Sequence, residues 1–256
     1  MIVYFSGTGN SRMVALMLRH PGEQAIEIPS VPEKIQLEEG ERVVWVFPVY
    51  AWGLPPVVRR YMKELPLAPG HGRHFMVCTC GDDVGLTHLE WRRMVKRRGW
   101  RPVATFSVRM PNTYVLLPGF DVDTAEVAGE KLSAAPARVR AIARAIRHEA
   151  RIDDVTRGSV PWIKSRILRP LFHWFLMSPK PFHYTSGCVG CGLCAARCPM
   201  NNIAFGKDRR PAWGTDCAMC LQCYHGCPHG AVAYGRATKG KGRYPGPSSY
   251  RSYPIR

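Results

Sequence analysis

Short apolar runs alternate with helically periodic segments along the first 150 residues of the chain. The strongest runs occupy residues 1–5, 42–47, 73–80 and 100–110. They are rich in β-branched and aromatic residues, a composition typical of buried β-strands. A shorter and less regular strand is expected near residues 25–28.

Between these runs, apolar side chains recur at helical intervals. The predicted helices cover residues 12–20, 56–65, 86–98 and 123–148. In the last segment four apolar residues repeat at i, i+3, i+4 and i+7 and predict one buried face: Val139, Ile142, Ala143 and Ile146. The arginines between them predict a solvated basic face, and Pro136 predicts a break in this helix.

The order of these elements predicts the fold class. Strands and helices follow one another as β, α, β, β, α, β, α, β with a closing helix, which is typical of α/β domains with a parallel sheet. We therefore predict a doubly wound sheet with strand order 2-1-3-4-5 over residues 1–150. Ligands of such sheets bind at the carboxyl ends of the strands, so the loops that follow the strands are the expected site.

Residues 151–186 fit neither a flexible linker nor a regular domain. The stretch 161–177 mixes large apolar side chains with Lys164, Arg166 and Arg169. Two hypotheses compete: this connector docks a C-terminal domain onto the first domain, or it lies on a membrane surface as a basic amphipathic element. We favour docking, because so many apolar groups must be buried somewhere.

Length and charge widen the picture. At 256 residues, the chain is expected to hold about two domains. It has no apolar, uncharged run of 18 residues that could span a bilayer. The net charge of +17 suits an acidic protein partner, an anionic membrane surface or nucleic acid, although a genome that favours arginine would also produce a basic surface.

The tail at residues 236–256 carries six basic residues and no acidic ones. Its glycines, prolines and serines predict an extended or disordered segment. No nucleic-acid-binding motif accompanies it, so we do not expect a nucleic-acid partner.

Eight of the ten cysteines form two copies of one pattern. These are Cys188-x2-Cys191-x2-Cys194-x3-Cys198-Pro199 and Cys217-x2-Cys220-x2-Cys223-x3-Cys227-Pro228. Four thiolates are the usual complement of a 4Fe-4S cluster, so the count fits two clusters. The alternatives are zinc sites and disulfides. Zinc sites separate two cysteine pairs by a longer spacer, which does not match this pattern. Disulfide frameworks suit small secreted chains. The chain opens on Met-Ile-Val-Tyr-Phe without a signal peptide, so we expect a cytoplasmic protein.

The two remaining cysteines, Cys78 and Cys80, alternate along one predicted strand and should face the same side of the sheet. We interpret them as packing residues rather than redox groups.

Residues 187–235 resemble the bacterial two-cluster 4Fe-4S ferredoxins, and the resemblance includes both Cys-Pro steps. In that pattern the fourth cysteine of each run binds the other cluster. The resemblance therefore implies two ligand sets: Cys188, Cys191 and Cys194 with Cys227, and Cys217, Cys220 and Cys223 with Cys198. So small a domain has little apolar core, and the clusters are expected to hold it together.

The first strand runs directly into Ser6-Gly7-Thr8-Gly9-Asn10-Ser11, and a helix follows. Glycines, hydroxyls and helix-start N–H groups suit a phosphate, although most such loops are plain turns. Neither a Walker loop nor the G-x-G-x-x-G fingerprint is present. The position after the opening strand resembles the phosphate loop of flavodoxins. This implies that Ser6, Thr8, Asn10 and Ser11, with the amides of Gly7 and Gly9, contact the phosphate of FMN.

Two further loops are expected to contact the flavin ring. The second loop includes Pro48, Tyr50, Trp52 and Gly53, and its aromatic side chains could stack on the ring, although core packing is the alternative for Trp52. The third loop comprises Cys80, Gly81, Asp82 and Asp83. Its acids would disfavour an anionic reduced ring, but we expect at least one of them to cap the next helix instead. The long connection at residues 111–120 is also expected near the flavin edge.

Taken together, these features resemble the flavodoxin-ferredoxin fusion proteins over nearly the whole chain. The acidic third loop and the strong positive charge depart from that family. The resemblance implies an electron-transfer protein that passes electrons between two 4Fe-4S clusters, an FMN and a redox protein partner. The alternatives are a flavin-dependent reductase of a quinone or other small acceptor, and a regulatory module that only senses redox state. No catalytic acid, nucleophile or nicotinamide-binding motif is present.

Overall fold

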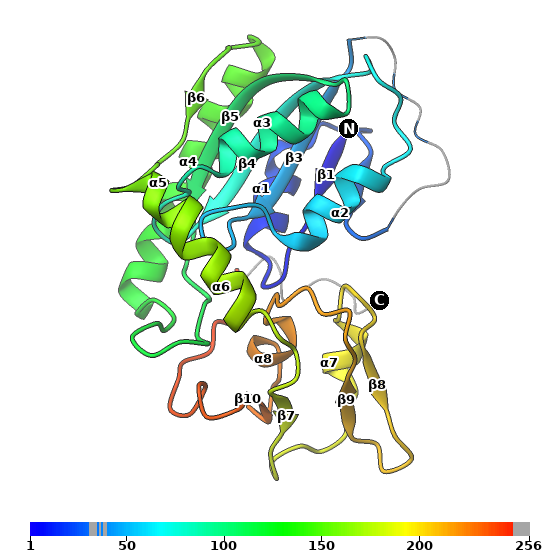
Figure 1. The fold of residues 1–256 in the computed structure, drawn as a ribbon, viewed down its shortest axis with the longest axis vertical. Helices are drawn as coiled ribbons and strands as arrows, with labels where there is room; N and C mark the ends of the chain where they lie inside the picture. Colours follow the sequence, from blue (N-terminus) through cyan, green and yellow to red (C-terminus); the bar gives the residue numbers. More distant parts are fainter. Residues whose placement is uncertain (31–34, 36, 38–39, 248–256) are drawn as a thin grey trace.

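The computed structural model describes residues 1–30, 35, 37 and 40–247. A helix-covered sheet forms one half of the molecule, and a smaller cysteine-rich half lies against the lower end of the sheet (Figure 1). Residues 151–181 join the two halves and include the helices nearest to the junction.

Six parallel strands form the sheet in the order β2-β1-β3-β4-β5-β6. They are β1 (Ile2–Tyr4), β2 (Ala25–Glu27), β3 (Arg42–Pro48), β4 (Arg73–Cys80), β5 (Arg101–Arg109) and β6 (Asp153–Asp154). The predicted order 2-1-3-4-5 is confirmed and fits a flavodoxin-like α/β fold. Strand β6 was not predicted, because two aspartates carry no strand signal. It is held at the sheet edge by Arg92, which pairs with Asp153, and Arg138, which pairs with Asp154.

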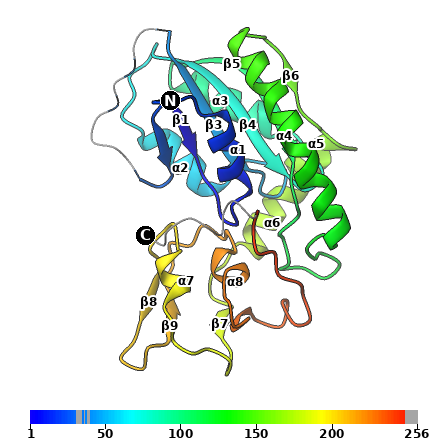
Figure 2. The ribbon, with the colours of Figure 1, turned by 180° about the vertical axis from the view of Figure 1, so that it is seen from behind.

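Helices cover both faces of the sheet (Figure 2). One face packs on α1 (Asn10–Leu18) and α4 (Ala125–Arg147), and the other packs on α2 (Pro56–Glu64) and α3 (Thr87–Arg97). The buried face predicted for the last helix is confirmed by Val139, Ile142 and Ile146. The predicted break is wrong, since α4 runs through Pro136. Burial of Ala135 and Val139 on either side holds the helix together there despite the missing N–H.

Cys78 and Cys80 lie on the same side of β4, as their alternation predicts. Both are buried in the core beneath α2 and α3. Burial raises the pKa of the Cys80 thiol to about 12, so the thiol is protonated at neutral pH. This environment is that of a packing residue rather than a nucleophile.

The connector forms one nearly continuous helical rod, Pro161–Leu176. It consists of α5 (Pro161–Ile163), a π-helical turn η1 (Lys164–Leu168) and α6 (Arg169–Leu176). Pro170 lies two residues after this turn and lacks an N–H to donate to the Arg166 carbonyl. Among the described residues, no helix combines the length and apolar character needed to cross a bilayer.

The cysteine-rich half is built from short elements. Strand β7 (Phe182–Tyr184) pairs antiparallel with β10 (Val232–Tyr234), and β8 (Ile203–Phe205) pairs with β9 (Pro211–Trp213). Helices α7 (Leu193–Ala196) and α8 (Gln222–His225) each carry the third cysteine of one run. A small apolar cluster that includes Phe182, Tyr224 and Val232 lies between them.

The described part of the tail packs against both halves. Residues 236–240 form turns, and residues 241–247 have no regular secondary structure but make specific side-chain contacts. The Tyr244 hydroxyl donates to Asn10 Oδ1 at 2.7 Å, and Lys241 Nζ donates to the Phe120 carbonyl at 2.7 Å. The Arg243 guanidinium lies 3.9 Å from the ring centroid of Tyr224. These contacts are specific to particular side chains, which a composition argument cannot detect. Residues 248–256 lie outside the described part of the chain.

His74 makes folding pH-dependent. It is fully buried on β4, accepts a hydrogen bond from Trp45 Nε1 at 3.0 Å and stacks on Trp100 at 4.8 Å. Burial lowers its pKa to about 4, below the ordinary 6.5. The unfolded chain therefore binds more protons between these values, so the free energy of unfolding falls as pH drops from about 6.5 to about 4.

We expect His74 to contribute about 3 kcal/mol to this fall. Denaturant unfolding of wild type and His74→Gln across this pH range should give a flatter pH profile for the variant. His148→Gln, at an exposed histidine, is the matched control and should keep the wild-type slope. Equal slopes for all three proteins would contradict this assignment.

Candidate functional site

One cavity of about 360 Å³ lies where the carboxyl ends of the strands meet the cysteine-rich half. Its volume falls within the range of cofactor and ligand pockets. All three predicted loops line it, and of their predicted residues only Gly9 and Gly53 are absent from the described lining. The structure thus brings together side chains that the sequence places more than 70 residues apart.

The phosphate loop is fixed by its own side chains. Ser6 Oγ accepts a hydrogen bond from the Gly9 N–H at 3.2 Å, and Ser11 Oγ lies 2.7 Å from Thr79 Oγ1. The Asn10 amide donates to the Pro111 carbonyl at 3.0 Å. These three side chains build the loop, so phosphate contacts would come chiefly from Thr8 and from backbone N–H groups.

Backbone N–H groups are available at the start of α1. The first turn of any helix leaves its N–H groups without intrahelical partners, and these groups attract anions. Gly9 precedes α1 with φ of 97°, a left-handed conformation that glycine adopts without strain. Gly9 therefore shapes the loop rather than lining the cavity.

The second loop makes a tight turn after β3. Tyr50 and Gly53 exchange two backbone hydrogen bonds of 2.9 and 3.1 Å, and Ala51 and Trp52 between them have φ of 42° and 58°. Left-handed backbone at two non-glycine residues is strained and persists only where the surroundings impose it. Ser165 of the rod supplies one restraint, since its hydroxyl donates to the Trp52 carbonyl at 3.0 Å.

Gly53 lies outside the cavity because it makes room for the rod. A side chain there would overlap the guanidinium of Arg169. That guanidinium is almost fully buried, pairs with Glu90 at 2.6 Å and donates to the Leu54 carbonyl at 3.1 Å. The second loop is therefore clamped to the rod at Ser165 and Arg169.

The third loop is less acidic in effect than its sequence suggests. Asp83 forms an ion pair of 2.6 Å with Lys164 of the rod, and Asp82 is exposed. The expected capping role is wrong, because no carboxylate caps α3. Instead the Ser165 hydroxyl accepts from the Leu86 N–H at 2.8 Å. Lys164 also lines the cavity and offsets the negative charge expected beside a flavin ring.

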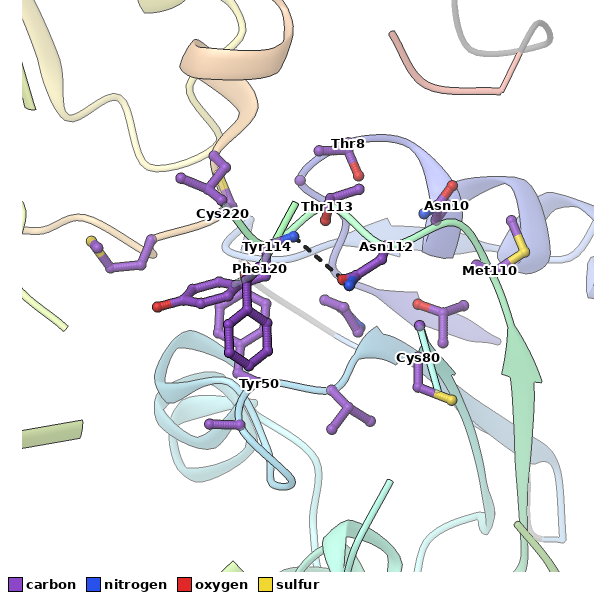
Figure 3. A pocket seen from close by; sticks show the side chains of 18 of the residues that line it. Thr8, Asn10, Tyr50, Cys80, Met110, Asn112, Thr113, Tyr114, Phe120 and Cys220 are labelled. Atoms are coloured by element: carbon purple, nitrogen blue, oxygen red, sulfur yellow. Dashed lines mark hydrogen bonds between the residues drawn. The ribbon is translucent and has the colours of Figure 1, made fainter. Parts of the chain in front are cut away.

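Residues 110–120 form the remaining wall, as expected for this connection. Tyr114 and Phe120 turn toward the same side of the cavity as Tyr50 (Figure 3). The ring of Tyr114 meets that of Phe120 edge-on at 5.6 Å and that of Phe172 of the rod at 5.5 Å. The cavity therefore has an aromatic wall as well as the polar phosphate loop.

The cysteine-rich half closes the cavity. Met219, Cys220 and Leu221 belong to its wall, and Figure 3 shows Cys220 entering from that half. The phosphate loop and the cysteine-rich half are in close contact at Gly7, where an added Cβ would lie only 2.5 Å from the Cys220 carbonyl oxygen. The phenol of Tyr50 lies there too: burial raises its pKa, and the charges of Cys220 and Cys217 raise it further.

Cys198 lies with the second cysteine run rather than with its own. A small cavity is lined by Cys198 together with Cys217, Cys220 and Cys223. Burial raises the pKa of Cys223 to about 12, and nearby Cys217 and Cys198 add to this effect. Burial also raises the pKa of Cys220, and the nearby Cys223, Cys217 and Cys198 raise it further. This is the ligand set that the ferredoxin resemblance implies.

Cys227 lies reciprocally near the first run. Burial raises the pKa of Cys194 to about 11, and the charges of Cys227 and Cys191 raise it further. Cys191 is exposed, whereas Cys220 faces the large cavity. One set therefore lies beside the predicted flavin loops and the other nearer the surface.

Hydrogen bonds to sulfur accompany these cysteines. Backbone N–H groups donate to Cys198, Cys217 and Cys227 at 3.3 to 3.4 Å, and Trp213 Nε1 donates to Cys223 at 3.5 Å. None of the described cysteines forms a disulfide. No group of three His, Cys, Asp or Glu side chains in the described chain converges closely enough for a single metal ion. A cubane cluster has a different requirement, because each thiolate binds a separate iron.

Several cavity residues were not predicted from the sequence. Lys164 and Phe172 come from the rod, Met177 follows it directly, and Met219, Cys220 and Leu221 come from the second cysteine run. No local pattern marks them, since their role arises from the docking of distant segments. The one available signal is the mixture of apolar and basic residues in the connector.

Comparisons with known proteins give little more. No protein-family model and no curated protein matches the chain. Among solved structures it is similar to a Streptococcus pneumonia TIGR4 flavodoxin, with 18% identity and a TM-score of 0.33. The match covers 55% of this chain and 97% of that one. A likeness this distant does not bear on function.

Proposed function

We propose that this chain is an intramolecular electron-transfer protein. It would hold two 4Fe-4S clusters and one FMN, and exchange electrons with an external redox protein. The single observation that carries the proposal is Cys220, which belongs to both the small four-cysteine cavity and the wall of the large cavity. Because Cys220 lines both cavities, the proposed flavin site and the proposed inner cluster site lie next to each other.

The large cavity has groups suited to both the phosphate and the ring of FMN. The loop at residues 6–11 would bind the phosphate through Thr8 and backbone N–H groups, without a lysine. The aromatic side chains of the wall, Tyr50, Trp52 and Tyr114, would enclose the ring. Lys164 lies beside them, and its ion pair with Asp83 would offset a carboxylate charge that otherwise disfavours an anionic reduced flavin.

The eight cysteines would bind the clusters in crossed sets. Cys217, Cys220, Cys223 and Cys198 would hold the inner cluster, next to the flavin. Cys188, Cys191, Cys194 and Cys227 would hold the outer cluster, nearer the surface. When bound, the clusters supply one-electron transfer, and the flavin accepts one or two electrons. The N–H donors to sulfur described above would adjust the cluster potentials.

The outer cluster is the proposed contact for the partner. Residues 187–256 carry ten basic and only two acidic side chains. A basic surface around an electron exit would attract an acidic protein and accelerate association at low ionic strength. None of the four cysteines of the outer set belongs to the described lining of the large cavity, whereas Cys220 of the inner set does.

Anaerobic purification tests the proposal. We expect about eight iron atoms and one FMN per chain, with two cluster signals by electron paramagnetic resonance. Chemical reduction of the clusters should be followed by bleaching of the flavin absorbance. A protein that binds iron but no flavin would refute the proposal. Steady-state turnover of a quinone without a protein partner would favour the reductase alternative instead.

A further inference from the structure

The rod at Pro161–Leu176 is docked along one side only. Ser165 and Arg169 are almost fully buried, and the Phe172 ring packs against Tyr114 at 5.5 Å. These residues recur at i, i+4 and i+7, which is the spacing of one helical face. The docking predicted for the connector accounts for this inner face.

The outer face of the rod is apolar and uncovered. Trp174 is 84% exposed, Phe175 70%, Trp162 60% and Leu171 50%. Ile163, Ile167 and Leu168 extend this face, and the rings of Trp174 and Phe175 stack at 5.9 Å. Figure 1 shows the rod on the side of the molecule turned to the viewer, between α3 and the cysteine-rich half. Large apolar side chains that are exposed together on one face of a helix mark an interaction site.

Positive charge surrounds this face. Residues 161–177 include three basic residues and no acidic one. Lys164 and Arg169 are engaged by Asp83 and Glu90, whereas Arg166 is exposed. Beside the rod, Arg59 of α2 also pairs with Glu90, at 2.7 Å, whereas Arg93 of α3 is exposed. Burial raises the pKa of Glu90, and the charges of Arg59, Arg166 and Arg93 lower it.

This combination selects among possible occupants. A second copy of the chain would bring together two like-charged faces on two molecules of net charge +17. An anionic bilayer would instead attract the exposed Arg93 and Arg166. Tryptophan is also the side chain that favours the lipid headgroup region.

We propose that the outer face of the rod binds the surface of an anionic lipid bilayer. Trp162, Leu171, Trp174 and Phe175 would enter the headgroup and acyl boundary, and the exposed Arg93 and Arg166 would meet lipid phosphates. The same rod lines the large cavity from its inner face, through Lys164 and Phe172. Binding would therefore hold that cavity beside the membrane surface. This inference does not depend on which cofactors the cavity holds.

Vesicle flotation of the full chain tests this inference. Wild type should float with vesicles of equal phosphatidylglycerol and phosphatidylcholine, and binding should fall at high salt. The double variant Trp174→Ala with Phe175→Ala should bind at least about tenfold more weakly, because it loses two exposed aromatic anchors. Arg166→Gln should weaken binding mainly at low salt.

A matched control comes from the other side of the sheet. Met17 on α1 and Val127 on α4 are 38% and 39% exposed, and their replacement by alanine should leave flotation unchanged. Circular dichroism and the visible spectrum should match wild type in every variant. Failure of wild type to float, or equal flotation of the aromatic double variant, would overturn the inference. A dimer in sedimentation velocity that the double variant dissociates, without flotation of wild type, would assign the face to a second copy.

Discussion

Replacing Gly7 by alanine is expected to push the phosphate loop away from the cysteine-rich half. The added Cβ would lie 2.5 Å from the Cys220 carbonyl oxygen and 2.8 Å from the Cys220 Cβ. Neither atom belongs to the free end of a flexible side chain, so the backbone itself must move. Overpacking of this kind costs about 1 to 3 kcal/mol of unfolding free energy.

The same displacement should weaken flavin binding, because Gly7 lies in the proposed phosphate site. We expect FMN affinity to fall at least about tenfold, equivalent to about 1.4 kcal/mol. Flavin titration and thermal unfolding measure the two effects. Electron transfer from the clusters to the flavin should also slow in the fraction that retains FMN.

Gly129→Ala is the control for glycine replacement. Gly129 lies within α4, and an added Cβ would meet no atom within 4 Å. Alanine there should leave FMN affinity unchanged and raise helix stability by up to about 1 kcal/mol. If Gly7→Ala behaved like Gly129→Ala, the close contact between the two halves would be excluded.

Replacement of Cys198 or Cys227, the fourth cysteine of each run, should remove the cluster held mainly by the other run. Cys198 belongs to the first run in sequence but lies in the cavity with Cys217, Cys220 and Cys223. Cys198→Ser should therefore remove the inner cluster, lower the iron content from about eight to about four atoms, and abolish reduction of the flavin by the remaining cluster. Iron analysis, paramagnetic resonance and flavin bleaching report these changes.

Cys227→Ser should give the complementary result. It should remove the outer cluster, lower the iron content by the same amount, and leave the inner cluster in exchange with the flavin. Cys78→Ala provides a control, because that thiol is buried in the sheet and should not affect iron content. If Cys198→Ser left flavin reduction intact while Cys227→Ser abolished it, each run would bind its own cluster and the crossed arrangement would be refuted.

Local patterns were sufficient for the sheet and the loops at its edge. Strand β4 begins at Arg73 and ends at Cys80, as predicted, because a long buried strand has a strong apolar signal with clear ends. The three loops follow from the strands, since parallel strands present their carboxyl ends at one edge. The expected faces of α4 and of β4 follow from periodicity alone.

Long-range polar contacts could not be predicted in this way. The N–H of Leu86, the residue before α3, donates to Ser165, which lies 79 residues later in the chain, rather than to the adjacent aspartates. The charge of Asp83 is balanced by Lys164, which lies 81 residues later in the sequence. Such partners are chosen by the docking of the rod, and no periodic signal encodes them. Docking of the rod also does not exclude a membrane contact, since one of its faces is buried and the other is exposed.

The contact between Tyr244 and Asn10 bears on how the protein matures. The two residues are 234 positions apart, and the Met219–Leu221 wall also comes late in the chain. At about 5 to 20 residues per second, a ribosome needs roughly 10 to 50 s to synthesise the intervening segment. The cavity at residues 6–11 is thus completed only after residues 219–244 have been synthesised, and it cannot close around a ligand before then. Under the proposed function, a cofactor would be enclosed in that cavity only after the cysteine-rich half has been made.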